Sequence, residues 1–243
     1  MDHKRIEWLF FIVFLLIDIY LGIEILRSPV NLSGADTTTR SVASIRSEMK
    51  SDNIDLPDKL SNAPASGYYL ATKNRNYLSN KIDALTNVNV RYSKDENVLY
   101  AAPKMTTLLD KNPKKALEQV NKFKNDPKNV PYGKEFKYEP DMSSEDNYVF
   151  VQTTDYGEIY AGSAQLSIAV KDHQIINYAE SYMGPASPVR ELQSTISAVR
   201  AVGAMYTNRE LTNNSKVTQI KLGYSKLTEV RGSTILLPTW LVW

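Results

Sequence analysis

The chain has 243 residues, of which 42% are hydrophobic and 23% charged, and it contains 15 tyrosine and 6 phenylalanine residues. This composition is enough to build a core in one large domain or two small ones, and it excludes a disordered chain. The net charge of +2 is too small to indicate nucleic-acid binding, and the lack of cysteine excludes disulfides, thiol catalysis and cysteine metal sites.

Histidine is scarce in this sequence. His3 precedes a long apolar segment and His173 follows it, so we expect the two on opposite sides of a membrane. A histidine metal cage or a nucleophile–histidine–acid triad could then draw only on His173. Histidine-dependent chemistry is therefore not expected.

The densest apolar segment runs from Ile6 to Leu26. Its 21 residues would extend roughly 31 Å as a helix, which matches the hydrocarbon thickness of a bilayer. Lys4 and Arg5 precede the segment and only Arg27 follows it closely, so the positive-inside rule places the N-terminus in the cytoplasm. We expect a single-pass protein of the cell membrane whose C-terminal domain is extracellular.

A cleaved signal peptide is the alternative interpretation of this segment. Ser33-Gly34-Ala35 resembles a small-residue cleavage site. It lies about nine residues past the apolar run, which is far, and the run is longer than a usual signal sequence. Asp2 and Glu7 are also unusual in the N-terminal part of a signal peptide. We therefore expect an uncleaved anchor.

Asp18 is the most informative residue of the segment, because a carboxylate near the middle of a bilayer costs about 2.5–3.5 kcal/mol. A helix that served only as a tether would be more stable with leucine there. Gly22, one turn further on, would let another backbone come close. The alternative is that Asp18 is protonated and bonded within its own helix. The residues expected to contact partner transmembrane helices are Phe11, Phe14, Leu15, Asp18, Leu21, Gly22 and Ile25.

The first half of the remaining chain alternates short strands and helices. Asn112 and Pro113 predict a helix start, since asparagine is a good cap and proline is favoured at the first helical position. In chain order we expect a polar stalk over Ser28–Thr39, a helix over Thr39–Lys50, a connector over Leu56–Gly67, a strand over Gly67–Thr72, a helix over Tyr77–Leu85, a hairpin of Val88–Tyr92 and Val98–Ala102, a helix over Lys114–Phe123 and a loop over Asn125–Gly133.

The second half is more regular. Ser187 and Pro188 predict the start of a long helix that ends near Tyr206, with an apolar stripe that includes Val189 and Leu192. Short polar turns separate the other apolar runs. The strands expected here cover Tyr148–Thr153, Glu158–Tyr160, Ala164–Val170, Ile175–Tyr182, Val217–Leu227 and Ile235–Trp243.

These elements predict an α+β fold. Hairpin spacing implies antiparallel pairing, and too few helices intervene for a parallel sheet. We expect one N-terminal transmembrane helix followed by a domain of antiparallel sheet with helices packed on one face. The expected divisions are a cytoplasmic tail and anchor over 1–27, a juxtamembrane stalk with a short helix over 28–63, an N-terminal α+β half over 64–140 and a C-terminal α+β half over 141–243.

No motif in the chain indicates a reaction. A phosphate loop, a dinucleotide fingerprint, a nucleophile elbow and a calcium loop are all absent from the sequence. We therefore expect neither an enzyme nor a bound cofactor or metal. Several carboxylates fall in expected loops, where an acid–base pair for sugar cleavage cannot be told from solubilising charge. They are Glu139, Asp141, Glu145, Asp146, Asp155 and Glu158.

Two features leave a choice between an ordinary surface and a binding surface. Lys104–Lys137 is rich in lysine and Glu139–Glu158 is acidic, which indicates either solvated surface or patches that dock a partner or an anionic wall polymer. Tyrosines along the expected strands either pack on the sheet or form an aromatic surface for a ligand. They include Tyr68, Tyr69, Tyr178, Tyr182 and Tyr224.

Motifs near the two ends carry a family resemblance. The opening has Met1-Asp2, then Lys4-Arg5, then the run Phe10–Leu21 ending in LLIDIYL, and it resembles the start of the YycI family. Leu222-Gly223-Tyr224 followed by Leu237-Pro238-Thr239-Trp240 is similar to the closing hairpin of that family and to PepSY-like domains. The order of these motifs in one chain supports the resemblance. The resemblance implies some further residues after the Pro-x-Trp motif, whereas this chain stops at Trp243. Either it is a short form or the sequence is cut, and we expect the last strand to lack its partner.

The resemblance implies a regulatory role. YycI proteins lie with YycH in the membrane beside the sensor kinase WalK, also called YycG, which controls cell-wall metabolism genes in low-GC Gram-positive bacteria. Carried over by position, the contact residues would lie within Phe10–Ile25, including Asp18. The expected function is that of a non-enzymatic accessory regulator, with a WalK-like kinase and a YycH-like membrane protein as partners.

Two other functions remain open at this point. One is a membrane-anchored extracellular module that binds a cell-wall polymer or peptide, with a passive anchor. The other is an envelope enzyme, for which the sequence offers no specific pair of catalytic carboxylates.

Overall fold

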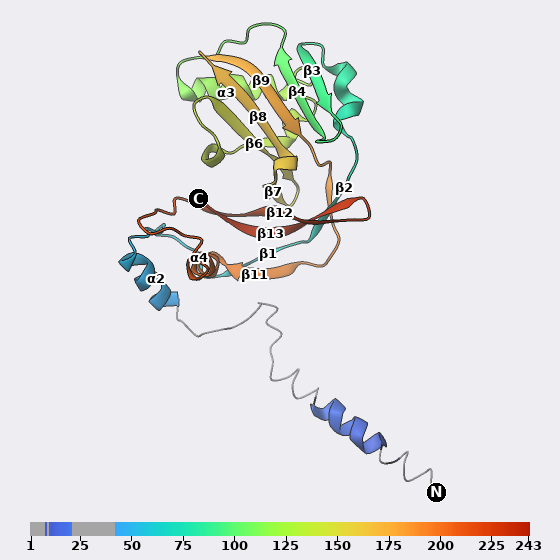
Figure 1. Cartoon of the computed structure of the whole chain (residues 1–243), viewed down its shortest axis with the longest axis vertical. Helices are drawn as coiled ribbons and strands as arrows, with labels where there is room; N and C mark the ends of the chain where they lie inside the picture. Colours follow the sequence, from blue (N-terminus) through green and yellow to red (C-terminus); the bar gives the residue numbers. More distant parts are fainter. Residues whose placement is uncertain (1–7, 9, 21–41) are drawn as a thin grey trace. The chain divides into compact units, whose positions relative to one another are not determined.

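The computed structural model describes residues 8, 10–20 and 42–243, and it divides the chain into two units, Met1–Ala43 and Ser44–Trp243 (Figure 1). In the first unit, residues 8 and 10–20 are helical. The second unit has a mixed α+β fold, with a large, mainly antiparallel sheet and few helices in its described part.

Eleven strands form the large sheet, in the order β10-β2-β13-β12-β7-β6-β8-β9-β4-β3, with β5 paired to β6. Neighbours are antiparallel except β12 and β7, which pair in parallel at Tyr224 and Ile159. Strands from both expected halves, 64–140 and 141–243, belong to this one sheet. The strands are β2 Leu70–Lys73, β3 Val88–Ser93, β4 Val98–Pro103, β5 Phe136–Tyr138, β6 Asn147–Thr154, β7 Gly157–Ile159, β8 Gln165–Lys171, β9 Gln174–Ser181, β10 Ala186–Pro188, β12 Ile220–Val230 and β13 Ser233–Val242.

Three α-helices and four 3₁₀ turns accompany the strands in residues 42–243. The start of α3 confirms the helix signal in the sequence: the side chain of Asn112 accepts a hydrogen bond from the N–H of Lys114 at 3.0 Å, and Pro113 is the first helical residue. The helices are α2 Val42–Ser51, α3 Pro113–Asn125 and α4 Ala198–Thr207, and the 3₁₀ turns are η1 Leu78–Ala84, η2 Gly133–Glu135, η3 Pro140–Met142 and η4 Gly162–Ala164.

The long helix predicted from Ser187 to Tyr206 is wrong over its first half. Residues 186–188 form β10, and the helix α4 begins only at Ala198. Its cap is Ser197, whose hydroxyl accepts a hydrogen bond from the N–H of Arg200 at 3.3 Å. Val189 and Leu192, expected on a buried stripe, are each 52% exposed.

Long-range pairing explains this difference. Gln193–Ser197 forms strand β11, which pairs with β1, Pro64–Gly67, in a separate two-stranded sheet. The indole N–H of Trp240 also donates to the carbonyl of Ile196 at 2.8 Å. These hydrogen bonds come from segments far away in sequence, so the residues of β11 and β1 show no local sequence pattern that predicts a strand. The connector expected over Leu56–Gly67 accordingly ends in a strand.

The other hairpins confirm their predictions. Val88–Ser93 pairs with Val98–Pro103, and Gln165–Lys171 pairs with Gln174–Ser181. The last strand, expected to lack a partner, pairs with β12 along its length and with β2 over Ser233–Leu236, so that expectation is wrong.

The core of the second unit has three parts. In the first, α3 packs on strands β4, β6, β8 and β9. In the second, β2, β7, β12 and β13 meet the segment that follows β9. In the third, α2 packs on α4 and on one end each of β12 and β13. The helices therefore gather in two clusters. Central residues are Leu99, Val120, Phe150, Leu166, Ile168 and Tyr178 in the first, Leu70, Ile159, Tyr224 and Leu236 in the second, and Met49, Ile54 and Val202 in the third.

Candidate functional site

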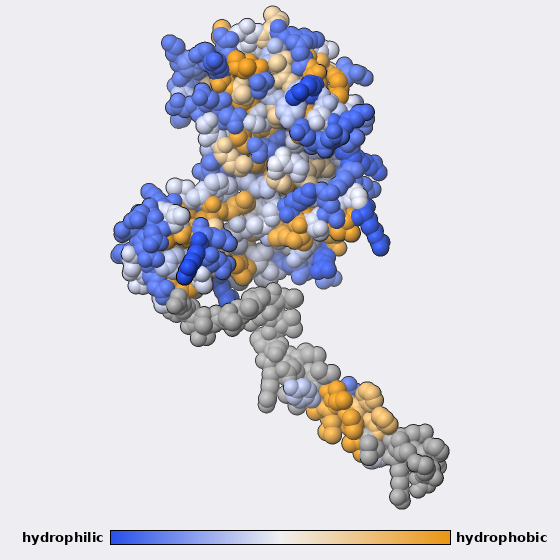
Figure 2. All heavy atoms as spheres, in the orientation of Figure 1, coloured by the Kyte–Doolittle hydropathy of each residue, from blue (hydrophilic) through white to orange (hydrophobic). Residues whose placement is uncertain are grey.

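The helix of residues 10–20 carries four of the seven predicted contact residues. Phe11, Phe14 and Leu15 are 63%, 61% and 47% exposed, and Asp18 is also exposed. Figure 2 shows this helix as a largely hydrophobic surface. The remaining predicted contacts lie outside the described residues; they are Leu21, Gly22 and Ile25.

None of the helices in the described part of the chain is both long enough and apolar enough to span a bilayer. The transmembrane anchor over Ile6–Leu26 stays a prediction.

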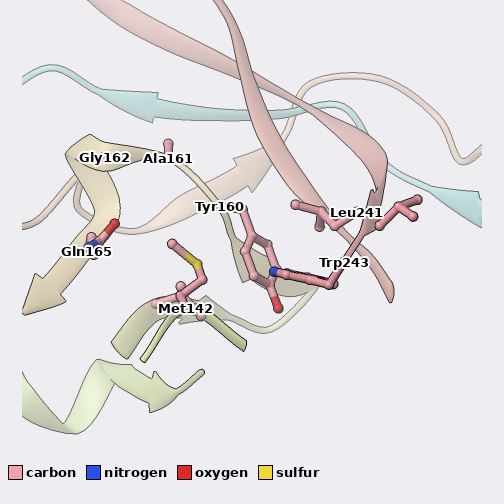
Figure 3. A pocket seen from close by; sticks show the side chains of 9 residues that line it. Met142, Tyr160, Ala161, Gly162, Gln165, Leu241 and Trp243 are labelled. Atoms are coloured by element: carbon pink, nitrogen blue, oxygen red, sulfur yellow. The ribbon is translucent and has the colours of Figure 1, made fainter. Parts of the chain in front are cut away.

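A pocket lies beside the end of β13, where Tyr160 and Trp243 form an aromatic wall (Figure 3). Their ring centroids are 5.6 Å apart in an edge-on arrangement. The volume is about 320 Å³, near the lower end of the range for small-molecule sites. We call it the C-terminal pocket. It is lined by Met142, Val151, Tyr160, Ala161, Gly162, Gln165, Leu241, Val242 and Trp243.

Backbone hydrogen bonds hold both aromatic residues in place. The N–H of Tyr160, just after β7, donates to the carbonyl of Tyr224 at 2.7 Å, and the N–H of Trp243 donates to Gln219 at 3.0 Å. Gly223 makes room for the Tyr160 ring, because a Cβ at that position would lie 2.7 Å from two ring atoms and 2.8 Å from Leu241. The Leu222-Gly223-Tyr224 motif thus has a structural explanation in this wall.

Glu139 supports the same wall from inside the protein. It is 2% exposed, and its two oxygens accept hydrogen bonds from Lys221 Nζ at 2.9 and 3.0 Å. Its Oε2 also accepts a hydrogen bond from the hydroxyl of Tyr160 at 2.6 Å. Lys221 Nζ lies 5.3 Å from the centre of the Trp243 ring and 3.8 Å from Asp141 Oδ2. One partly buried ion pair therefore connects both aromatic residues of the pocket.

The electrostatics of this cluster favour structure over proton transfer. Burial alone would raise the pKa of Glu139, but hydrogen bonds from Tyr160 and Lys221 outweigh it and lower the pKa below its ordinary value. Burial, followed by the hydrogen bond to Glu139, raises the pKa of Tyr160. At neutral pH the carboxylate stays ionised and the phenol stays protonated, so neither group is tuned for acid–base catalysis.

Glu139 is one of the loop carboxylates for which the sequence leaves a choice between a catalytic pair and solubilising charge. It is buried against a lysine 82 residues away, so it is not a solubilising charge. Lys221 lies near the start of β12, a strand that also carries Lys226 and Glu229, so the sequence gives no local signal for this pairing. Glu145 and Asp155 are exposed, as the interpretation as solubilising charge predicts.

A second buried carboxyl was missed altogether. Glu180, on β9, is fully buried; its Oε1 accepts a hydrogen bond from the N–H of Tyr132 at 3.1 Å, while its Oε2 has no partner among the described residues. Burial raises the pKa of Glu180 to about 8. Lys124 is also buried and donates to the carbonyls of Gly133 and Phe136, and burial lowers its pKa to about 8.

The tyrosines mainly pack in the core. Tyr178, Tyr182 and Tyr224 are 1%, 3% and 4% exposed, which confirms sheet packing for these three. Tyr68 and Tyr69 are half-buried, with Tyr68 against the edge of Tyr156 and Tyr69 beneath Arg190. Within residues 8, 10–20 and 42–243, no three acidic or histidine side chains are grouped as a metal site would require.

Comparison with known proteins gives one family match. A search of curated proteins finds no match. Among solved structures, an uncharacterized protein from Eubacterium rectale ATCC 33656 is similar at 10% identity, with a TM-score of 0.46, over 79% of this chain and 82% of the other. YycH from Bacillus subtilis is similar at 11% identity, with a TM-score of 0.44, over 75% of this chain and 51% of YycH. The family model described as YycI protein matches residues 32–243, and the chain therefore belongs to the YycI family.

Proposed function

We propose that this protein is a non-enzymatic accessory regulator of a WalK-like (YycG-like) sensor histidine kinase that controls cell-wall metabolism. It would lie in the cell membrane with a cytoplasmic N-terminus and an extracellular C-terminal domain. Its helix would contact the helices of the kinase and of a YycH-like membrane protein.

The observation that carries this proposal is membership of the YycI family over residues 32–243. That family is one of regulatory accessory proteins, and membership supports a role in the YycG/WalK regulatory system.

The proposed mechanism requires a surface that distinguishes two states of the kinase. A regulator can shift an equilibrium only by its difference in affinity for the two states. The exposed residues Phe11, Phe14 and Leu15 offer close packing, and Asp18 offers a hydrogen bond that a lipid cannot replace. We propose that this face binds one signalling state of the kinase more tightly.

The helix α2 gives the folded unit a firm attachment to the chain that leads to the proposed anchor. Met49 of α2 is 2% exposed and packs in one cluster with Val202 of α4. Tyr206 of α4 donates a hydrogen bond to Asp52 at 2.7 Å, just after α2. A rearrangement near α4 would therefore move α2.

A binding module for a cell-wall polymer or peptide is the second candidate function. The C-terminal pocket favours it, because Tyr160 and Trp243 form an aromatic wall of the kind found in ligand sites. In that case the anchor would be passive and the folded unit would carry the function.

One experiment separates the two candidates. Residues 6–26 are replaced by an unrelated apolar helix, and the full-length protein is co-purified with the kinase and with the YycH-like protein from membranes. Regulation through helix contacts predicts loss of both co-purification and kinase control, at unchanged protein level. Retention of both would contradict the helix-contact proposal and support the binding module.

A further inference from the structure

A second pocket lies between the β3–β4 turn, the end of β2 and the β12–β13 hairpin. Its volume is about 390 Å³, within the range of sites for small molecules. Among its lining residues, the side chains of Thr72, Tyr182, Met183 and Thr234 are buried and form its floor. We call it the polar pocket, because exposed charged and amide side chains make up most of the rest of its lining.

Charges of both signs surround the polar pocket. Lys226 and Glu229, both on β12, form an ion pair with each other and so compensate one another. Two cationic residues remain at the end of β2, Lys73 and Arg75. Two anionic residues, Asp95 and Glu96, remain in the β3–β4 turn.

These four charges come from different elements and are not neutralised by one another. In the described part of the chain, none of these four side chains forms an ion pair. Glu96 does accept a hydrogen bond from the hydroxyl of Tyr100 at 3.2 Å. One side of the polar pocket can therefore attract an anion while the other attracts a cation. Arginine suits a carboxylate especially well, because its guanidinium can donate two parallel hydrogen bonds.

The floor adds a polar group that lacks a partner. The hydroxyl of Thr234 donates to Asn74 Oδ1 at 2.7 Å, whereas the Thr72 hydroxyl has no hydrogen-bond partner among the described residues. A buried hydroxyl without a partner destabilises a protein. A polar atom of a ligand seated on this floor would supply the missing hydrogen bond after a small rotation of the Thr72 side chain.

We propose that the polar pocket binds a small zwitterionic ligand of the short-peptide class. The ligand carboxylate faces Lys73 and Arg75, and its ammonium group faces Asp95 and Glu96. This ligand site does not depend on transmembrane contacts or on the kinase.

The test is calorimetric titration of the full-length protein with the dipeptide Ala-Ala and with two capped forms. N-acetyl-Ala-Ala lacks the ammonium group, and Ala-Ala amide lacks the carboxylate. A hydrogen bond to a charged group is strong enough that we expect each cap to weaken binding about tenfold or more. Absence of Ala-Ala binding at millimolar concentration, or equal binding of the capped forms, overturns the proposal.

Charge variants identify the pocket and the orientation of the ligand. Arg75→Gln should weaken binding of Ala-Ala about tenfold while leaving the already weak binding of Ala-Ala amide unchanged. Asp95→Asn combined with Glu96→Gln should weaken binding of Ala-Ala about tenfold and leave the already weak binding of N-acetyl-Ala-Ala unchanged. Exposed charges outside the pocket provide matched controls, Lys111→Gln and Glu145→Gln. If the controls weaken binding as much as the pocket variants, or if Arg75→Gln weakens both peptides equally, the proposed site is wrong.

Thr72→Val separates binding from folding. Valine has nearly the same shape as threonine and removes the unpartnered hydroxyl, so the midpoint of urea unfolding should not fall. Affinity for Ala-Ala should drop several-fold if the hydroxyl contacts the ligand. A lower unfolding midpoint with unchanged affinity would show that Thr72 has no part in binding, and would contradict the proposed floor.

Discussion

Lys221 donates hydrogen bonds to both carboxylate oxygens of Glu139, across 82 residues of sequence and at 2.9 and 3.0 Å. Glu139 is 2% exposed, so its charge depends on this partner and on Tyr160. Such a pair fixes β12 to the loop that precedes η3. It also positions the Tyr160 and Trp243 rings of the C-terminal pocket.

Glu139→Gln should therefore destabilise the protein. The substitution leaves Lys221 with the more distant Asp141 as its carboxylate partner, and we expect the free energy of unfolding to fall by about 1–3 kcal/mol at pH 7. Because the folded pKa of Glu139 is lowered, its contribution is present above the unfolded pKa, about 4.3, and is lost as the pH falls through the folded pKa. Urea unfolding followed by tryptophan fluorescence measures both effects.

Glu145→Gln is the matched control, since Glu145 is exposed. It should change the free energy of unfolding by less than about 0.5 kcal/mol. Equal effects of the two substitutions would show that the Glu139–Lys221 pair does not stabilise the fold.

The features that could be predicted from sequence are local ones. The cap at Asn112 and the hairpin β3–β4 depend on residues adjacent in the chain, and both were found. The strand β11 depends on pairing with Pro64–Gly67, which is far away in sequence. The sequence predicts helix there because the apolar stripe of α4, which begins at Ala198, follows directly. The burial of Glu139 and Glu180 could not be predicted because their hydrogen-bond partners are also distant in sequence.

Glu180 should make stability fall as the pH rises. Its folded pKa, about 8, lies above its unfolded value, about 4.3, so the folded protein binds more protons between these values. The free energy of unfolding should decrease from about pH 4.3 to about pH 8. Glu180→Gln, which resembles the protonated acid, should remove most of this slope and stabilise the protein at pH 8 by on the order of 2 kcal/mol.

Lys124 allows a check on this assignment. Its folded pKa, about 8, lies below the ordinary value of 10.5, so its own effect makes stability rise between about pH 8 and pH 10.5. The slope removed by Glu180→Gln must therefore lie below pH 8. A wild-type stability that is flat from pH 5 to pH 8 would contradict the raised pKa of Glu180.

Two glycines should respond in opposite ways to alanine. A Cβ at Gly223 would lie 2.7 Å from the Tyr160 ring, so Gly223→Ala must displace the aromatic wall and should cost about 1–3 kcal/mol. At Gly203, inside α4, a Cβ would lie 3.7 Å from Ile45, an ordinary contact. Gly203→Ala should be neutral or stabilise by up to about 1 kcal/mol, because alanine favours helix. Thermal unfolding of both variants measures the difference, and a Gly223→Ala variant as stable as Gly203→Ala would mean that the Tyr160 wall moves freely.

Asp18→Leu tests the proposed helix contact at one residue. Removal of a hydrogen bond between helices should weaken association with the kinase by about 0.6–2 kcal/mol, or roughly three- to thirtyfold. Asp18→Asn retains a hydrogen-bonding group and should keep most of the affinity. The measurement is energy transfer between labelled full-length protein and kinase in vesicles.

Tyr20→Leu is the control for this substitution, because it also removes a polar group from the described helix but lies about 200° around the helix from Asp18. It should leave association unchanged. If Asp18→Leu binds and regulates the kinase as wild type does, Asp18 has no role in the contact. If Tyr20→Leu weakens binding as strongly as Asp18→Leu does, the contact is not confined to the proposed face. Affinity for the kinase would then depend on any polar group of this helix.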